Sequence, residues 1–305
     1  MKHNLKITAI IICMFLLTQL IGLFVYTIYT DKLQLPYGME PPEEIKEKPQ
    51  GKEIIVAFAI AVALFFLLIR LKADTFIRLW FLLVTVIAIS LSINAVLFKI
   101  SVDNYSQFLA LLIALPLAYF KIFKRDLIVH NITELLIYPG IAAVFIPLLN
   151  IKWTVIILLL ISLYDMWAVW HSQFMQKMAK YQINNLKFFT GFFVPYASKK
   201  EKEKIRFLKQ KYAKNPKELE KQFKKSKIKV NLAILGGGDV IFPIIASGVF
   251  YKTYLSILPS IIIMIFSTLA LLFLFVIARK GKFYPAMPFI TFGIYLGMII
   301  NWLMF

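Results

Sequence analysis

Two aspartates in apolar surroundings are the residues of this sequence best suited to chemistry. Asp165 lies in the run ISLYDMWAVW and Asp239 in the run AILGGGDVIFP, and both runs belong to apolar stretches long enough to cross a bilayer. An aspartate near the bilayer centre costs roughly 2.5 to 3.5 kcal/mol on insertion scales. That cost indicates a function that offsets it.

A pair of carboxylates in a poorly solvated site shares one proton, because both cannot ionise easily. This state suits peptide hydrolysis: the ionised member takes a proton from an attacking water, and the protonated member donates a hydrogen bond to the substrate carbonyl. The titration belongs to the pair, so acid and base are not assigned individually. The same residues also fit a proton-coupled transporter, or a structural role in which each carboxylate bonds to a neighbouring helix.

Three consecutive glycines, Gly236, Gly237 and Gly238, precede Asp239. Each weakens a helix by about 1 kcal/mol relative to alanine. Without side chains they let another backbone approach, and they leave the helix soft enough to unwind and pair with an extended substrate. Close helix packing remains the alternative for at least one of them.

Two prolines open the last apolar run, in FYPAMPF. Pro285 and Pro288 remove two backbone donors and disfavour a regular helix start. Carbonyl groups are then left available for a partner; the ordinary alternative is a proline near a helix start.

A third acid, Glu134, lies near the start of the fifth apolar run, in NITE. Asn131 and Glu134 have the spacing of a capping box. We therefore expect Glu134 to be structural.

The composition predicts an all-α membrane protein. Of the 305 residues 60% are hydrophobic and 17% charged, and the mean hydropathy is +0.75. The first run exceeds the h-region of a signal peptide and is interpreted as a retained span, and the single cysteine, Cys13, excludes an intramolecular disulfide. We predict nine transmembrane helices, at about 7–29, 53–71, 76–98, 105–122, 132–151, 153–174, 230–251, 254–278 and 284–305.

Charge distribution predicts the orientation of these spans. Most of the 35 Lys and Arg residues fall on one side if the N-terminus is cytoplasmic and the C-terminus extracytoplasmic, which the positive-inside rule favours. The sixth and seventh spans are then antiparallel, with Asp165 and Asp239 at similar depth. The net charge of +19 is thus explained by membrane lipid rather than by nucleic acid.

The chain divides into three parts of one membrane domain. Residues 1–174 hold the first six spans with an extracytoplasmic hairpin at 30–52, residues 175–229 form a basic cytoplasmic loop, and residues 230–305 hold the last three spans. Within the loop, residues 187–196 are apolar but too short to span, which favours an interfacial or re-entrant segment.

Three short motifs, in order along the last four spans, resemble those of the GxGD intramembrane aspartyl proteases, the family of presenilin and signal peptide peptidase. The chain looks most similar to archaeal presenilin homologues. The motifs are YD at Tyr164-Asp165, GxGD at Gly236-Gly237-Gly238-Asp239, and a PAL-like Pro285-Ala286-Met287. Glycine stands at the variable position of GxGD, where leucine is common, and methionine replaces the leucine of PAL.

The resemblance implies a presenilin-like bundle and an aspartic endopeptidase that cleaves peptide bonds within transmembrane segments. It implies that Asp165 and Asp239 form the catalytic dyad, and that further residues shape the site and contact substrate: Tyr164, Gly236, Gly237, Gly238, Pro285, Ala286 and Met287. A preflagellin or prepilin-type signal peptidase is the alternative among enzymes, but that type lacks the PAL-like element and has fewer spans.

Cofactors and partners are also implied. His171 has no partner histidine at ligand spacing, so no metal is expected, nor any organic cofactor. The expected substrates are single-span membrane proteins or peptides, with no obligatory partner subunit, and the expected location is an archaeal or other prokaryotic cell membrane.

Overall fold

The structure is a computed structural model of the chain. The structure describes residues 5–31, 35–39, 51–100, 105–124, 126–171, 181, 189–197, 199–212, 226, 230–278 and 284–305.

Helices dominate this part of the chain. Nine of them have 18 residues or more: α1 (Leu5–Asp31), α3 (Gly51–Arg70), α4 (Asp74–Lys99), α5 (Ser106–Phe123), α6 (Leu127–Phe145), α7 (Ile151–Trp170), α11 (Gly237–Tyr254), α12 (Ile257–Ile277) and α13 (Met287–Met304). A short 3₁₀ helix, η1 (Ile146–Leu148), follows α6. The predicted helical membrane bundle is confirmed.

Eight of these helices are apolar and long enough to cross a membrane by length and composition, and the ninth long helix, α11, falls outside that set. Its composition is less apolar because it contains Asp239, Lys252 and several glycines. Large apolar side chains cover the outside of the bundle, and Trp302, for example, is 77% exposed. A soluble protein rarely exposes so much apolar surface, so this surface is suited to lipid.

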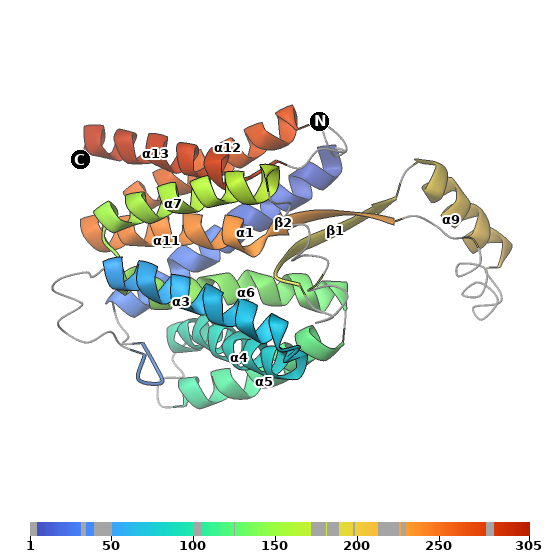
Figure 1. Cartoon of the computed structure of the whole chain (residues 1–305), viewed down its shortest axis with the longest axis horizontal. Coiled ribbons are helices and arrows are strands. Elements are labelled where there is room, and N and C mark those ends of the chain that lie inside the picture. The colour runs from blue at the N-terminus through green and yellow to red at the C-terminus, as the bar shows by residue number, and fades with distance from the viewer. Residues whose placement is uncertain are drawn as a thin grey trace.

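The least apolar of the nine long helices, α11, lies at the centre of the bundle. Figure 1 shows α11 running between α6 and α7, and it also packs against α1, α12 and α13. Its Val240, Ile244 and Val249 are fully buried. The helix is therefore enclosed by other helices from Val240 onward, whereas Gly238 in its first turn is exposed.

A two-stranded antiparallel sheet precedes α11, a feature that the sequence analysis did not predict. Strand β1 (Gly191–Ala197) pairs with β2 (Val230–Gly236), with Gly191 opposite Gly236. Helix α9 (Lys199–Lys211) follows β1, and Figure 1 shows the sheet and α9 projecting from the end of the bundle at which α1 begins. The apolar segment predicted at 187–196 overlaps β1.

The sheet corrects the start of the predicted span at 230–251. The first seven of those residues form β2, and the helix begins only at Gly237. The β-branched Ile234 favours a strand, and β1 supplies the pairing partner.

The start of α6 also differs from its prediction. Asp126 caps the helix, since its Oδ1 accepts hydrogen bonds from the N–H groups of Ile128 (2.8 Å) and Val129 (3.0 Å). Asn131 and Glu134 thus lie inside the helix, and the predicted capping box is wrong. Asp126 satisfies the free N–H groups one turn earlier than the sequence pattern indicated.

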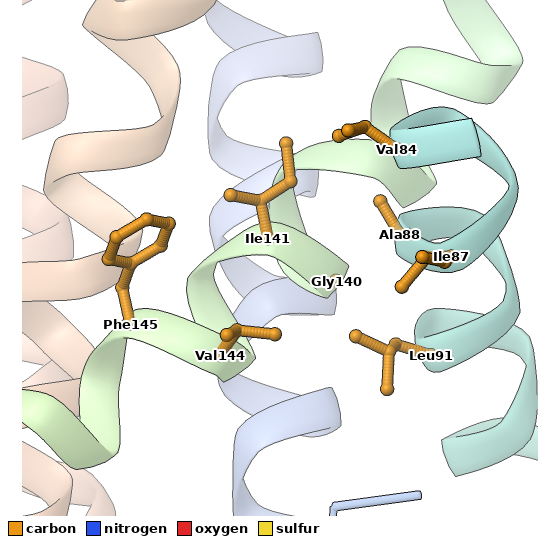
Figure 2. Close-up of a pocket in the computed structure, with 8 residues that line it drawn as sticks. All are labelled: Val84, Ile87, Ala88, Leu91, Gly140, Ile141, Val144 and Phe145. Atoms are coloured by element: carbon orange, nitrogen blue, oxygen red, sulfur yellow. The ribbon is translucent and has the colours of Figure 1, made fainter. Parts of the chain in front are cut away.

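An apolar cavity of about 170 Å³ lies between α4 and α6. Figure 2 shows the side chains that line it, all of them apolar: Val84, Ile87, Ala88, Leu91, Gly140, Ile141, Val144 and Phe145. Without a polar group this cavity offers no chemistry. At its edge, Gly140 lets α6 approach the backbone of α4, because a Cβ atom there would meet the Ala88 carbonyl.

Replacing this glycine tests the close approach of α4 and α6. Gly140→Ala is expected to lower the thermal unfolding midpoint of the purified protein by several degrees, since an overpacked interface costs about 1 to 3 kcal/mol. Tryptophan fluorescence on heating would measure the midpoint. Gly238→Ala is the matched control, because nothing lies within 4 Å of a Cβ atom at that position. Equal midpoints for the two variants would contradict the packing described.

Candidate active site

Three helix ends meet where the sequence predicted a site. Asp165 lies in the last turns of α7, Asp239 in the first turn of α11, and Met287 begins α13. Helix α7 packs against both other helices, and α11 also packs against α13. Residues separated by more than 120 positions are thereby brought together.

Asp165 is attached to the start of α13. Its side chain is buried, and its Oδ2 accepts a hydrogen bond from the N–H of Met287 at 3.1 Å. The backbone of Ala286 also bonds to this carboxylate. The first residues of a helix have N–H groups without partners in the helix. The N-cap residue of α13 is Ala286, and its side chain makes no capping hydrogen bond. The Asp165 carboxylate fills that role from another helix.

A second polar contact joins the same two helices. Ser162, one turn before Asp165, donates a hydrogen bond from its hydroxyl to Thr291 Oγ1 at 2.7 Å, and both residues are buried. The position of Asp165 relative to α13 is thus fixed by contacts on two successive turns.

Asp239 is attached to the start of its own helix. Its carboxylate bonds to the backbone of Gly236, the residue that caps α11. An acidic side chain in the first turn that reaches back to the capping residue is one half of a capping box. Asp239 also interacts electrostatically with Asp165, so the two carboxylates belong to one site.

The three glycines differ in their surroundings. A Cβ atom at Gly237 would lie 2.8 Å from the hydroxyl oxygen of Tyr138, whereas nothing lies within 4 Å of one at Gly238. At Gly236 it would lie 3.1 Å from Asp239 Oδ2. Close packing therefore explains Gly237, open space beside Asp239 explains Gly238, and Gly236 leaves room for the carboxylate itself.

The remaining predicted residues are at different distances from the two carboxylates. Met287 and Ala286 contact Asp165 through their backbone, and Pro285 is buried directly before them. Tyr164 is 46% exposed, and its ring lies beside Trp167 on the outside of α7. The structure does not bring Tyr164 to the contacts that hold the two aspartates.

Tyr138 of α6 is a neighbour of the site that the sequence analysis missed. It is buried, its ring packs edge-on against Phe192 of β1, and its hydroxyl lies against Gly237. No local pattern marks such a tyrosine, because its role depends on three segments that are distant in sequence.

The chemistry available here is that of carboxylates and backbone groups. In the described ranges no three His, Cys, Asp or Glu side chains gather as a metal ion would require. Two interacting carboxylates, with open space beside one of them, are suited to activating a water molecule against a carbonyl group.

Comparison with known proteins agrees with this helical membrane bundle. The chain matches the model of the family described as signal-peptide peptidase, presenilin aspartyl protease over residues 12–305. It belongs to that family. It is therefore an integral, multi-pass membrane protein and an aspartic endopeptidase that acts within the membrane.

Solved structures share the fold. Two are of a presenilin family intramembrane aspartate protease, in the C222 and P2 space groups. The first has a TM-score of 0.61 at 16% identity, covering 98% of this chain and 99% of that chain. The second has a TM-score of 0.59 at 16% identity, covering 97% of each. No curated protein matches the chain significantly.

The unequal glycines generate a paired test. Gly237→Ala is expected to lower both the thermal midpoint and proteolytic activity, because the new methyl group presses on Tyr138. Gly238→Ala is expected to keep the midpoint and to raise KM, because it fills space beside Asp239. Thermal unfolding and steady-state cleavage of a labelled transmembrane peptide would measure both effects.

A compensating change identifies the cause. Combining Gly237→Ala with Tyr138→Leu should recover part of the lost stability relative to the sum of the single changes. Equal behaviour of the two alanine variants would count against the difference between these positions.

Proposed function

We propose that Asp165 and Asp239 are the catalytic dyad with which this protease hydrolyses peptide bonds inside transmembrane segments. The observation that carries the proposal is the meeting of both carboxylates, within electrostatic range, at the starts of α11 and α13. Both are held by backbone hydrogen bonds, so little reorganisation is needed when substrate binds.

The proposed reaction is general acid and base catalysis by a pair that holds one proton. The ionised aspartate takes a proton from water as the water oxygen bonds to the substrate carbonyl carbon. The protonated aspartate donates its proton to the carbonyl oxygen, which gives a tetrahedral diol. The C–N bond then breaks as the nitrogen gains a proton from one aspartate and a hydroxyl of the diol gives its proton to the other, so the pair returns to its single shared proton.

The substrate must be extended at the cleaved bond, since a helix keeps its peptide groups internally bonded. Strand β2 supports this requirement. In β1, Gly191 and Phe193 direct their N–H and C=O groups to α6, so Phe192 and Val194 direct theirs to Leu235 and Ala233 of β2. The N–H and C=O groups of Leu232 and Ile234 then face the other edge. A substrate segment that adds to this edge would lead toward Asp239, which follows β2 by three residues.

The open space at Gly238 gives such a segment a close approach to the dyad. Pro285, Ala286 and Met287 would line the opposite side, with Tyr164 nearer the lipid. These residues are proposed to contact substrate.

The proposed orientation has the N-terminus in the cytoplasm. The basic helix α9 projects from the end of the bundle at which α1 begins, so the positive-inside rule favours a cytoplasmic location for that end (Figure 1). The dyad then lies toward the cytoplasmic side. Substrates are single-span proteins whose amino end is extracytoplasmic, in a prokaryotic cell membrane.

Replacing each aspartate tests the dyad. Asp165→Asn and Asp239→Asn should each lower cleavage of a labelled transmembrane peptide at least about a thousandfold, because neither amide can exchange the proton. Cleavage is measured with the purified chain in liposomes, without any partner, added metal or organic cofactor. Asp126→Asn is the matched control, since asparagine also caps a helix.

The same preparation separates the alternatives. Cleavage by the unmodified chain alone supports a protease that needs no partner subunit. Aspartate-dependent solute flux without cleavage would instead favour transport and would contradict the proposed chemistry.

Cysteine labelling tests the orientation. In a Cys13→Ser background, Leu255→Cys, on the exposed turn after α11, should react with an impermeant maleimide in intact cells. Phe207→Cys, exposed on α9, should react only after permeabilisation. Mass-tag gel shifts would measure both, and the reverse pattern would invert the topology.

A further inference from the structure

We infer that three side chains of α6, His130, Asn131 and Glu134, act as a strand clamp that pairs with the outer edge of β1 and so positions the sheet beside the dyad. This inference rests on the proposed function, because the positioned sheet is the one proposed to receive substrate. Its geometry concerns α6 and β1 alone.

The strand clamp satisfies both backbone groups at two alternate positions of β1. The N–H of Gly191 donates to Glu134 Oε1 at 3.3 Å, and the C=O of Gly191 lies 2.7 Å from His130 Nε2. The N–H of Phe193 donates to Asn131 Oδ1 at 3.0 Å, and its C=O accepts from Asn131 Nδ2 at 2.8 Å.

Alternate residues of a strand direct their backbone groups to the same edge. Because Gly191 and Phe193 use theirs on α6, the edge that a third strand would occupy is filled by side chains of a helix. The opposite edge of the sheet, formed by β2, is the one that remains for an extended segment.

A buried lysine supports the strand clamp. Lys121 of α5 forms an ion pair with Glu134, and both side chains are almost fully buried. Its Nζ also lies 3.5 Å from His130 Nδ1. A lysine ammonium donates and cannot accept, so Nδ1 is the acceptor and Nε2 bears the proton that is donated to Gly191.

Such a buried ion pair is weak evidence for stability, since desolvation offsets much of the attraction. The better attested role of a buried ion pair is to fix the register of the elements that it joins. Here the register matters because Gly191 lies opposite Gly236, and Gly236 bonds to Asp239. The strand clamp therefore connects to Asp239 through one pair of residues.

Gly191 itself supports this interpretation. Its φ of +145° is rarely adopted by residues with a side chain, and a Cβ atom there would lie 2.7 Å from the Phe189 ring and would also meet the Leu235 carbonyl. Position 191, at the centre of the contact, therefore accepts only glycine.

Asn131→Leu tests the strand clamp, because leucine has a similar size but forms neither bond to Phe193. Thr133→Val is the matched control on the same helix, since the Thr133 hydroxyl donates to carbonyl groups of α6 itself (2.8 Å). The full chain in lipid nanodiscs would be compared by amide hydrogen exchange over residues 189–197, and by kcat and KM on a labelled transmembrane peptide.

We expect Asn131→Leu to raise exchange over 189–197 roughly tenfold, as the loss of two backbone hydrogen bonds implies. It should also raise KM several-fold with less change in kcat, because the sheet binds a part of the substrate that does not react. Thr133→Val should change neither quantity.

His130→Phe provides a second variant, since it keeps the ring beside Phe193 and loses the bond to Gly191 together with the contact to Lys121. It should raise exchange less than Asn131→Leu does. Unchanged exchange in both variants would overturn the strand clamp, and faster exchange with unaltered KM would overturn its role in receiving substrate. An inactive unmodified chain would instead count against the proposed function, and exchange alone would then decide whether the strand clamp exists.

Discussion

Unpaired N–H groups at the starts of helices are the constraint on which this site depends. A helix that begins inside an apolar medium must have those groups satisfied by protein, because water is scarce there. Asp165 satisfies the start of α13 and Asp239 that of α11. The hydrogen bonds that allow two helices to begin within the bundle are thus the same bonds that orient the two carboxylates.

This constraint explains why α11 is the least apolar of the long helices and yet lies at the centre. A helix that begins with two glycines and Asp239 would be poorly suited to a lipid-facing position. Surrounded by α1, α6, α7, α12 and α13, it exposes few polar groups to lipid, and its buried Val240 and Ile244 supply packing. Strand β2 ends at Gly236 and α11 begins at Gly237, so little backbone is left unsatisfied between the two elements.

Much of this arrangement could be predicted from the sequence. Long apolar runs define helices by length alone, and two acids inside them are rare enough to mark a site. The sheet could not be predicted, because β1 and β2 are separated by more than 30 residues and stabilise each other only when paired. The capping box failed because Asp126 is an equally good cap, and local spacing does not distinguish the two.

The position between the two glycines of the GxGD motif shows why other parts of the site could be explained only from the tertiary structure. Leucine is common at that position in the family that the motif resembles, and glycine stands there as Gly237. The space that a side chain would enter is occupied by Tyr138, whose hydroxyl would lie 2.8 Å from a Cβ atom. In this chain the volume beside position 237 is therefore filled from α6 and not by a side chain of α11. The local departure in the motif is explained by a residue about 100 positions earlier, which no reading of the motif alone reveals.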